Sequence, residues 1–349
     1  MRLNVESRHP WESEADVLAI PVPSHAELPE YLSEIDRRGG GAIERLRALG
    51  AIQGKLWEGR LIPVTDMAAE LVLAVGIDDG SAIDHLRARR FGAVVARRLA
   101  GCDVRRLAVY LPDAFLEAGG LTGSSALELV TRGLVEGAAD PSTIYRERGD
   151  SLPPELDVTT FVVESGDAAA LLARAERGQI MGEGVNRTRR LAQRAGNDVS
   201  PEVLADEASD VARQFGMELT VLGPEEAADM GMFMAVGKGS SSPPRFIALR
   251  NQPGIAADAR GRLLAMVGKG VTFDTGGISL KPPANMGEMK TDKTGASSVS
   301  HAIATAAQLA PDLPMLAVAP AVENMPGPHS SRPGDVVRAL NGKSVEITN

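Results

Sequence analysis

The sequence predicts an α/β protein with two domains. Its 349 residues are more than one hydrophobic core usually serves. Short apolar runs alternate with helix-like stretches in both halves of the chain, a pattern typical of βαβ units and of mainly parallel sheets. Apolar residues make up 44% of the chain but aromatic residues only 3%, so the cores must be built mostly from Ala, Val, Leu and Met.

The N-terminal part contains four apolar runs that predict strands, at residues 17–22, 71–75, 107–111 and 159–163. Stretches with helical patterning lie between these runs, at residues 41–49, 82–99 and 125–137. Strands that are separated by helices favour a parallel arrangement, because a crossover helix is long enough to return the chain to the start of the sheet.

Residues 167–194 are rich in Ala, Leu, Arg and Glu, and they predict helix. Three glycines interrupt the pattern, so the segment is either two helices or one bent helix. We place the domain boundary here. The expected organisation is an N-terminal α/β domain over residues 1–165, a helical linker over residues 166–196 and a second domain over residues 197–349.

The second domain opens with a helix signal, because Ser200 suits an N-cap, Pro201 the first helical position and Glu202 the first turn. Another α/β pattern follows it. The predicted strands are residues 219–222, 244–249, 263–267 and 315–321, with 244–249 and 263–267 expected to be buried, and the predicted helices are residues 225–231 and 297–309.

Composition excludes several classes of protein. The net charge of −9 argues against general nucleic-acid binding, which needs a basic face to neutralise phosphates. The single cysteine, Cys102, can form no disulfide within the chain, which fits a reducing cytoplasm. The first residues lack the apolar core of a secretory signal, and no apolar run is long enough to span a membrane.

The chemistry is concentrated in residues 267–296, VGKGVTFDTGGISLKPPANMGEMKTDKTGA. Lys269 follows an apolar run, Asp274 precedes two glycines, and Asp292 lies just before a predicted helix. In open α/β sheets, strand ends are where ligands usually bind. Carboxylates are hard oxygen ligands for Mn, Mg or Zn, and a lysine can join them only as the neutral amine. Together with Lys281, these residues favour a metal site over isolated salt bridges.

Other motifs fail. Gly342-Lys343-Ser344 resembles the end of a phosphate-binding P-loop, but the glycine required five residues earlier is Val337. The histidines form no HExxH pair, and there is no Gly-x-Ser-x-Gly elbow. A zincin, a serine hydrolase and a P-loop nucleotidase are therefore disfavoured.

The segment that contains these residues resembles the signature of the leucyl aminopeptidases, the M17 metallopeptidases or cytosol aminopeptidases. The resemblance continues through GEMKTD and AVENMPGPHSSRPGDVV, and it includes AVGKGSSSPPRFIALR and NDVSPEVLADEA upstream. It covers residues from about 180 to 349 well. The first 160 residues match only in general character. The implied fold is a smaller N-terminal α/β domain and a larger C-terminal α/β catalytic domain with a mixed central sheet.

The resemblance also implies a role for each residue. Lys269 matches a ligand of one metal, Asp274 a carboxylate that bridges two metals, and Asp292 a further ligand beside the lysine. Lys281 matches a catalytic lysine that polarises the scissile carbonyl of the substrate. Met289 matches a wall of the pocket for the substrate's N-terminal side chain. Two metals at such a site bind the substrate amine and activate a water.

The sequence departs from the family pattern in two places. The family continues after Asn349 into Thr-Asp-Ala-Glu-Gly-Arg, which supplies further carboxylate ligands and an arginine thought to hold bicarbonate. We therefore expect this sequence to be a C-terminally truncated, partial catalytic domain with exposed strand edges, an uncovered apolar face and doubtful activity. Lys293 stands where the family usually has methionine, so it either weakens metal binding or points to solvent.

The leading hypothesis is an aminopeptidase of the cytoplasm that uses two divalent ions, Mn²⁺ or Zn²⁺, to release N-terminal residues from peptides, preferably leucine-like ones. The complete protein is expected to form a homohexamer, to use bicarbonate and to bind neither membrane nor nucleic acid. The alternative is a catalytically impaired relative that acts as a binding or regulatory module. The absent ligands and Lys293 motivate this alternative.

Overall fold

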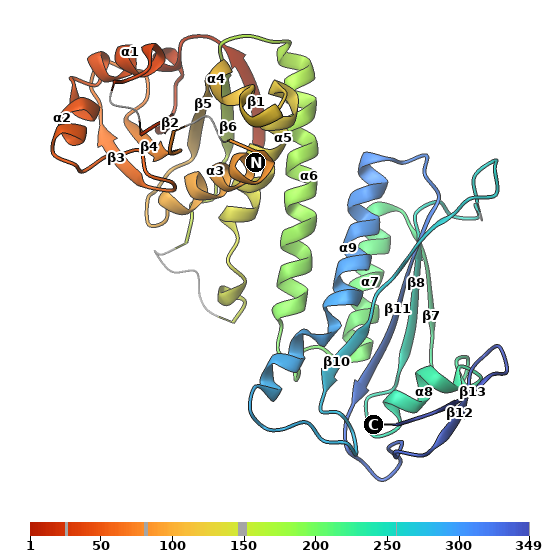
Figure 1. The fold of residues 1–349 in the computed structure, drawn as a ribbon. Coiled ribbons are helices and arrows are strands. Elements are labelled where there is room, and N and C mark those ends of the chain that lie inside the picture. The colour runs from red at the N-terminus through yellow and green to blue at the C-terminus, as the bar shows by residue number, and fades with distance from the viewer. Residues whose placement is uncertain (25–26, 80–82, 146–151, 256, 349) are drawn as a thin grey trace. The chain divides into compact units, whose positions relative to one another are not determined.

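The computed structural model describes residues 1–24, 27–79, 83–145, 152–255 and 257–348. Within them, the chain divides into two compact units, Met1–Asn186 and Arg187–Asn349 (Figure 1). The boundary lies inside one long helix, α6 (Ala168–Gln193), within the stretch predicted to link the domains. Among the described residues, no helix is long and apolar enough to cross a membrane.

The first unit is built on a six-stranded sheet in the order β1-β6-β5-β2-β4-β3, parallel except for β3. Its strands are β1 (Arg2–Ser7), β2 (Val17–Val22), β3 (Gly59–Pro63), β4 (Leu71–Gly76), β5 (Arg106–Leu111) and β6 (Val158–Val163). Its helices are η1 (Pro10–Glu12), α1 (Glu30–Arg38), α2 (Ala42–Ala48), α3 (His85–Arg98), α4 (Asp113–Leu116), η2 (Ala118–Gly120), α5 (Gly123–Ala138) and η3 (Pro141–Thr143).

Helices cover both faces of this sheet, because successive strand residues point to opposite sides. Val17 and Ala19 of β2 belong to a core shared with α3 and α5. Leu18 and Ile20 of the same strand belong to a second core shared with α1 and α2. The predicted alternation of strands and helices is confirmed, although β1, β3 and α1 were not predicted.

Helix α6 is continuous despite its glycines. A side chain at Gly178 would come within 2.2 Å of the Glu128 carbonyl oxygen, and one at Gly182 within 2.7 Å of Val135 Cβ. Both glycines therefore permit close contact with α5, and they do not end the helix. This resolves the choice between two helices and one in favour of one.

The second unit contains the mixed sheet that was predicted. Its elements are α7 (Pro201–Phe215), β7 (Glu218–Leu222), α8 (Gly231–Gly237), β8 (Arg245–Arg250), β9 (Leu264–Val267), β10 (Gly270–Asp274), η4 (Met286–Lys293), α9 (Thr294–Leu309), β11 (Met315–Asn324), β12 (Val336–Arg338) and β13 (Ser344–Glu346). The order β10-β11-β8-β7 combines a parallel pair with antiparallel pairs, and β9 also pairs with β11.

Two expectations for this unit are wrong. The helix predicted at residues 225–231 is a turn, in which the Glu226 carboxylate accepts a hydrogen bond from Gly223 N–H (2.9 Å), and α8 begins only at Gly231. Strand β9 is also not buried, since Leu264 is 47% exposed and Val267 74% exposed. The apolar run that predicted a buried strand lies at an edge, where among the described strands β9 pairs only with β11.

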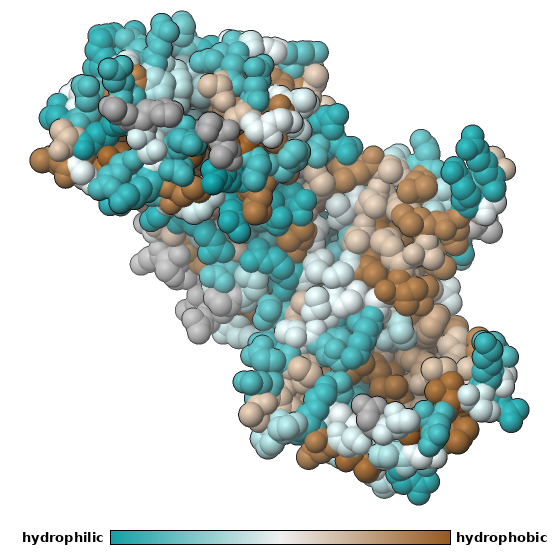
Figure 2. Space-filling model, viewed as in Figure 1, coloured by the Kyte–Doolittle hydropathy of each residue, from teal (hydrophilic) through white to brown (hydrophobic). Residues whose placement is uncertain are grey.

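Helices α7 and α9 contact the strands β8 and β11, and their apolar residues form one core with Ile247, Leu249 and Ala317. Figure 2 shows apolar side chains gathered over β7, β8 and β11 on the side that faces the viewer. Alternate residues of β11 are only partly buried, as are most of those in β8. An open strand edge and a partly uncovered apolar face were both expected.

Asp16 ties two neighbouring strands of the first unit. Its carboxylate accepts hydrogen bonds from the backbone N–H groups of Arg105 and Arg106, both at 2.8 Å, at the start of β5. The Arg106 guanidinium lies 2.9 Å from the other oxygen. Burial opposes ionisation of this carboxyl, but the hydrogen bonds outweigh it and hold its pKa below the ordinary value.

Asp16→Ala should lower the free energy of unfolding by about 1–3 kcal/mol, because two backbone donors lose their acceptor. Urea titration measures the change. Since the folded-state pKa is depressed, the stabilisation is present above the unfolded pKa and is lost as the pH falls through the folded value. Asp103→Ala is the matched control, because that side chain is 92% exposed. Equal losses in the two variants would contradict this role.

Candidate functional site

The predicted site begins where the edge strand of the second unit is interrupted. Strands β9 and β10 both pair with β11, and Gly268-Lys269 separates them. The interruption packs directly on the first turn of α9, because a side chain at Gly268 would come within 2.2 Å of the Gly295 carbonyl oxygen. Ala296 N–H also donates to the Lys269 carbonyl oxygen (2.8 Å). The backbone of Lys269 is thereby fixed beside the segment that contains Asp292.

Lys269 and Asp292 form an ion pair. Lys269 Nζ lies 2.7 Å from Asp292 Oδ2, and the two side chains are 59% and 22% exposed. The oxygen is buried and has no hydrogen-bond partner among the described residues. The short separation without hydrogen-bond geometry leaves this oxygen with free acceptor capacity. Lys269 is more exposed than the sequence predicted, since the strand before it is exposed as well.

Asp274 is the centre of a second cluster at the end of β10. Its Oδ2 lies 2.5 Å from Lys281 Nζ, and its Oδ1 accepts hydrogen bonds from Asn324 Nδ2 (2.7 Å) and Gly276 N–H (3.0 Å). Burial favours the neutral acid. The donors, with Lys281 first among them, outweigh burial and keep the pKa of Asp274 below its ordinary value. The group is therefore a carboxylate that is oriented on both oxygens.

The two glycines after Asp274 shape the loop that brings Lys281 back. Gly276 has φ 89° and Gly277 φ 71°, the left-handed region that glycine adopts without strain. Lys281 N–H donates to the Thr275 carbonyl oxygen (2.9 Å), which closes the loop. Thr275 Oγ1 donates to the Asn324 carbonyl oxygen (2.8 Å), so the loop is anchored on β11.

The short helix η4 connects the two clusters. It contains Met289 and Asp292, and residues three apart in a 3₁₀ helix lie on the same side. Lys281 Nζ lies 3.1 Å from Met289 Sδ, while Asp292 pairs with Lys269. The structure therefore places the five predicted residues in two clusters, Lys269–Asp292 and Asp274–Lys281–Met289, on or beside the neighbouring elements β10 and η4.

Asn324 was not predicted, although it orients Asp274. It is the last residue of β11, and it lies opposite Asp274 in the parallel pair β10–β11. A signal for it existed, because polar residues that follow an apolar strand at the carboxyl end of a sheet gather at one edge. The pairing of β10 with β11 could not be read from the sequence, so the contact was missed.

The donor set fits a divalent cation in part. Two carboxylates and a primary amine are present, and a buried Asp292 oxygen has free acceptor capacity. Carboxylate oxygens suit Mg²⁺ and Mn²⁺, while Zn²⁺ also accepts nitrogen ligands. Over the part of the chain that the structure describes, no group of three or more His, Cys, Asp or Glu residues is arranged to hold a metal. Any cation here would depend on Lys269 as well as the carboxylates.

The burial of Lys293 contradicts one of the two sequence-based alternatives. Its side chain is fully buried, so it does not point to solvent. Its Nζ donates to the carbonyl oxygens of Arg194 (2.7 Å) and Lys290. Burial lowers the pKa of Lys293 to about 8, and the neighbouring cations Lys290 and Arg194 act in the same direction. The amine joins η4 to the turn that precedes α7.

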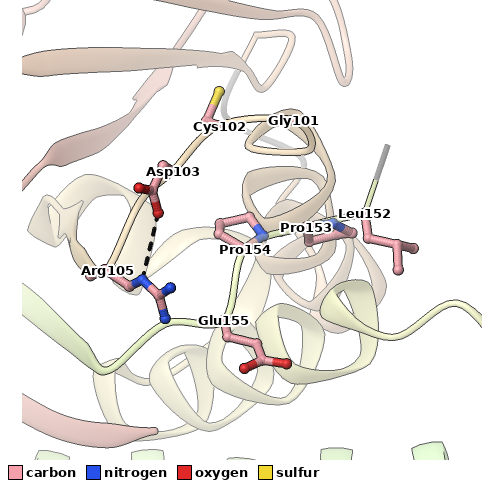
Figure 3. A pocket seen from close by; sticks show the side chains of 8 residues that line it. All are labelled: Gly101, Cys102, Asp103, Arg105, Leu152, Pro153, Pro154 and Glu155. Carbon is pink, nitrogen blue, oxygen red and sulfur yellow. Dashed lines mark ion pairs between the residues drawn. The ribbon is translucent and has the colours of Figure 1, made fainter. Parts of the chain in front are cut away.

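The cavities described in the first unit contain none of these residues. One of about 380 Å³ in the first unit is lined by Cys102, Pro153 and Pro154, with the pair Asp103–Arg105 (3.5 Å) at its wall (Figure 3). A lone thiol and a solvent-exposed ion pair provide no arrangement for peptide chemistry.

Comparison with known families gives two matches. The model of the "Cytosol aminopeptidase family, catalytic domain" matches residues 186–349, and the model of its N-terminal domain matches residues 19–138. The chain is 35% identical to a probable cytosol aminopeptidase of Solibacter usitatus, covering all of this chain and 68% of that protein. A relative from Syntrophotalea carbinolica is also 35% identical, over 91% of this chain and 64% of that protein. The chain thus spans about two thirds of their length.

Solved structures agree on the fold. The bottromycin maturation enzyme BotP in complex with Mn aligns over 96% of this chain and 65% of its own, with 26% identity and a TM-score of 0.76. A tomato leucine aminopeptidase mutant aligns over the whole chain and 68% of its own, with a TM-score of 0.83 at 23% identity. The second likeness shows the fold alone.

Lys293→Ala should lower the free energy of unfolding by about 2–4 kcal/mol, because it opens a cavity and leaves two carbonyl groups without a donor. Lys293→Met should cost less, since it retains the volume and removes a buried charge. Denaturant titration compares both with Lys343→Ala, a change at an exposed lysine. If alanine and methionine at this position behaved like the control, the buried amine would have no structural role.

Proposed function

The chain belongs to the cytosol aminopeptidase family, and we propose on that basis that it forms part of a metal-dependent aminopeptidase that removes N-terminal residues from peptides. The observation that carries the proposal is that the pairs Lys269–Asp292 and Asp274–Lys281 lie on or beside the neighbouring elements β10 and η4. Family membership supports the aminopeptidase class, and the bound Mn of BotP supports a divalent cofactor in this fold.

Lys269, Asp274 and Asp292 are the residues that would hold divalent ions, with Mn²⁺ or Zn²⁺ as the proposed metals. When bound, such ions supply Lewis-acid chemistry and a water of lowered pKa. Asp274 is prepared for this role, because Asn324 and Gly276 hold one of its oxygens in place. The buried Asp292 oxygen has free acceptor capacity, which favours a ligand role over a purely structural one.

Lys281 is the proposed catalytic cation. Its side chain is 35% exposed, so its ammonium can reach a bound molecule, and Asp274 and Met289 fix its direction. A charged donor that is aimed at the carbonyl oxygen stabilises the negative charge that develops there when water attacks. Because its contacts hold the Lys281 ammonium in place, this donor needs to move little during the reaction.

Met289 is the proposed contact for the substrate's N-terminal side chain. Its thioether lies beside the Lys281 ammonium. A substrate side chain that packs against Met289 would therefore lie next to the substrate carbonyl that Lys281 polarises. Methionine adapts to apolar groups of different shapes. This supports a preference for leucine-like residues. We also propose a cytoplasmic homohexamer and bicarbonate as a proton carrier for the complete protein.

Lys281→Ala in the natural full-length protein should lower kcat for leucyl p-nitroanilide by about 10²–10³-fold, because the oxyanion loses a charged donor. Initial rates with Mn²⁺, Zn²⁺, Mg²⁺ or Co²⁺ measure it, with Lys343→Ala as the exposed-lysine control. N-acetylated leucyl substrate should react poorly, since its amine is blocked. An absence of activity with all four metals would refute the enzyme assignment for this protein.

Asp292→Asn should weaken Mn²⁺ binding at least about tenfold, because a charged ligand becomes a neutral amide. Calorimetry at constant pH measures the affinity independently of activity. Asp312→Asn, at an exposed aspartate, should bind as the wild type does. If the wild-type protein bound no divalent ion, the alternative of a non-catalytic binding module would replace the enzyme.

A further inference from the structure

A cavity of about 840 Å³ lies at the carboxyl end of the sheet in the first unit. Three neighbouring parallel strands end at it: Ser7 is the last residue of β1, Tyr110 lies near the end of β5, and Glu164 follows β6. Ligands in open α/β sheets bind outside the carboxyl ends of the strands. The volume is also within the range of small-molecule sites.

The charge of the cavity favours a cation. Its lining contains the carboxylates of Glu12, Glu30, Glu34 and Glu164 and the guanidinium of Arg8, and Glu34 is neutralised by Arg37 and Arg38. Arg8 is already paired with Glu6 (3.0 Å). The carboxylates of Glu12 and Glu30 form no hydrogen bond or ion pair with any residue that the structure describes, and both residues are exposed. Two carboxylates are thus available to a ligand.

Aromatic rings complete the walls. Tyr31 and Tyr110 meet edge to face with centroids 5.7 Å apart. The Tyr110 hydroxyl donates to Glu164 Oε1 (2.5 Å), and Asp113 N–H donates to the other oxygen (3.0 Å), so this carboxylate is held in place. Burial and the Glu164 carboxylate raise the pKa of Tyr110, which keeps its hydroxyl protonated. Ring faces attract cations through their negative quadrupole.

The protein itself shows how this wall receives a guanidinium. Arg38 lies with its guanidinium carbon 4.9 Å from the centre of the Trp11 ring, while His9 stacks on that ring at 4.5 Å. Arg38 also pairs with Glu34 (2.7 Å), another lining residue. A ring and a carboxylate that already bind one internal cation have the chemistry to bind an external one.

We propose that this cavity binds an organic cation, a guanidinium or primary ammonium group on a flexible chain. The cation would pair with Glu12 and Glu30, and its apolar stem would lie against the aromatic wall. The same chemistry could come from a free polyamine or from an Arg or Lys side chain of a peptide. All the residues involved belong to the first unit, whereas the proposed peptidase residues belong to the second.

Calorimetry on the full chain tests the proposal with N-acetyl-arginine amide, and with N-acetyl-citrulline amide as its neutral counterpart. The arginine probe should bind saturably, and the citrulline probe should not. Glu12→Gln and Glu30→Gln should each weaken binding about threefold, while Glu225→Gln, an exposed change in the second unit, should have no effect. Binding should also weaken in high salt, because the carboxylates are exposed.

Arg38→Gln provides a test that misfolding cannot imitate. It removes the internal cation that competes for Trp11 and leaves Glu34 paired with Arg37 (2.6 Å), so the arginine probe should bind more tightly. Spermidine represents a free polyamine, and acetyl-Gly-Arg-Gly-amide represents the side chain of a peptide. The probe that binds more tightly identifies the source of the cation. Equal affinity for the citrulline probe, a Kd for the arginine probe weaker than about 10 mM, or no gain in Arg38→Gln would overturn the proposal.

Discussion

The close contact between Gly268 and Gly295 is the constraint on which the candidate active site depends. Neither position can accept a side chain, because a Cβ at either would lie 2.6 Å or less from backbone atoms of the other segment. The contact seats the interruption of the edge strand on the first turn of α9. Since Asp292 comes just before that helix and Lys269 lies in the interruption, one backbone contact sets the distance between two side chains that are far apart in the sequence.

In both units, the polar side chains of the proposed sites lie at the carboxyl ends of parallel strands. The two sites differ in how well they could be predicted from the sequence. The residues of the candidate active site lie within one segment, so their spacing could be recognised before any fold was known. The aromatic and acidic wall of the first unit is assembled from β1, η1, α1, β5 and β6. Its residues become neighbours only through strand order, which neither periodicity nor composition specifies.

Features that depend on local sequence could be predicted, whereas features that depend on neighbouring strands could not. Strand β2 was predicted with its observed bounds, because a fully buried parallel strand is continuously apolar. The Ser200 cap was correct because capping is local, and Ser200 Oγ accepts from Val203 N–H (3.3 Å). Strand β9 is exposed although it was expected to be buried, because an apolar run does not reveal whether another element covers it. Asn324 was missed because its role depends on which strand lies beside β10.

The effect of Lys293 on the site depends on the contacts of its buried amine. From the sequence, an added cation beside Asp292 either repelled metals or faced water. In the structure the amine does not face water, because it is buried and donates to two backbone carbonyls. Burial also lowers its pKa, so the charge it presents to Asp292 is smaller at mildly alkaline pH than that of an exposed lysine. The buried amine therefore fixes η4 to the rest of its unit.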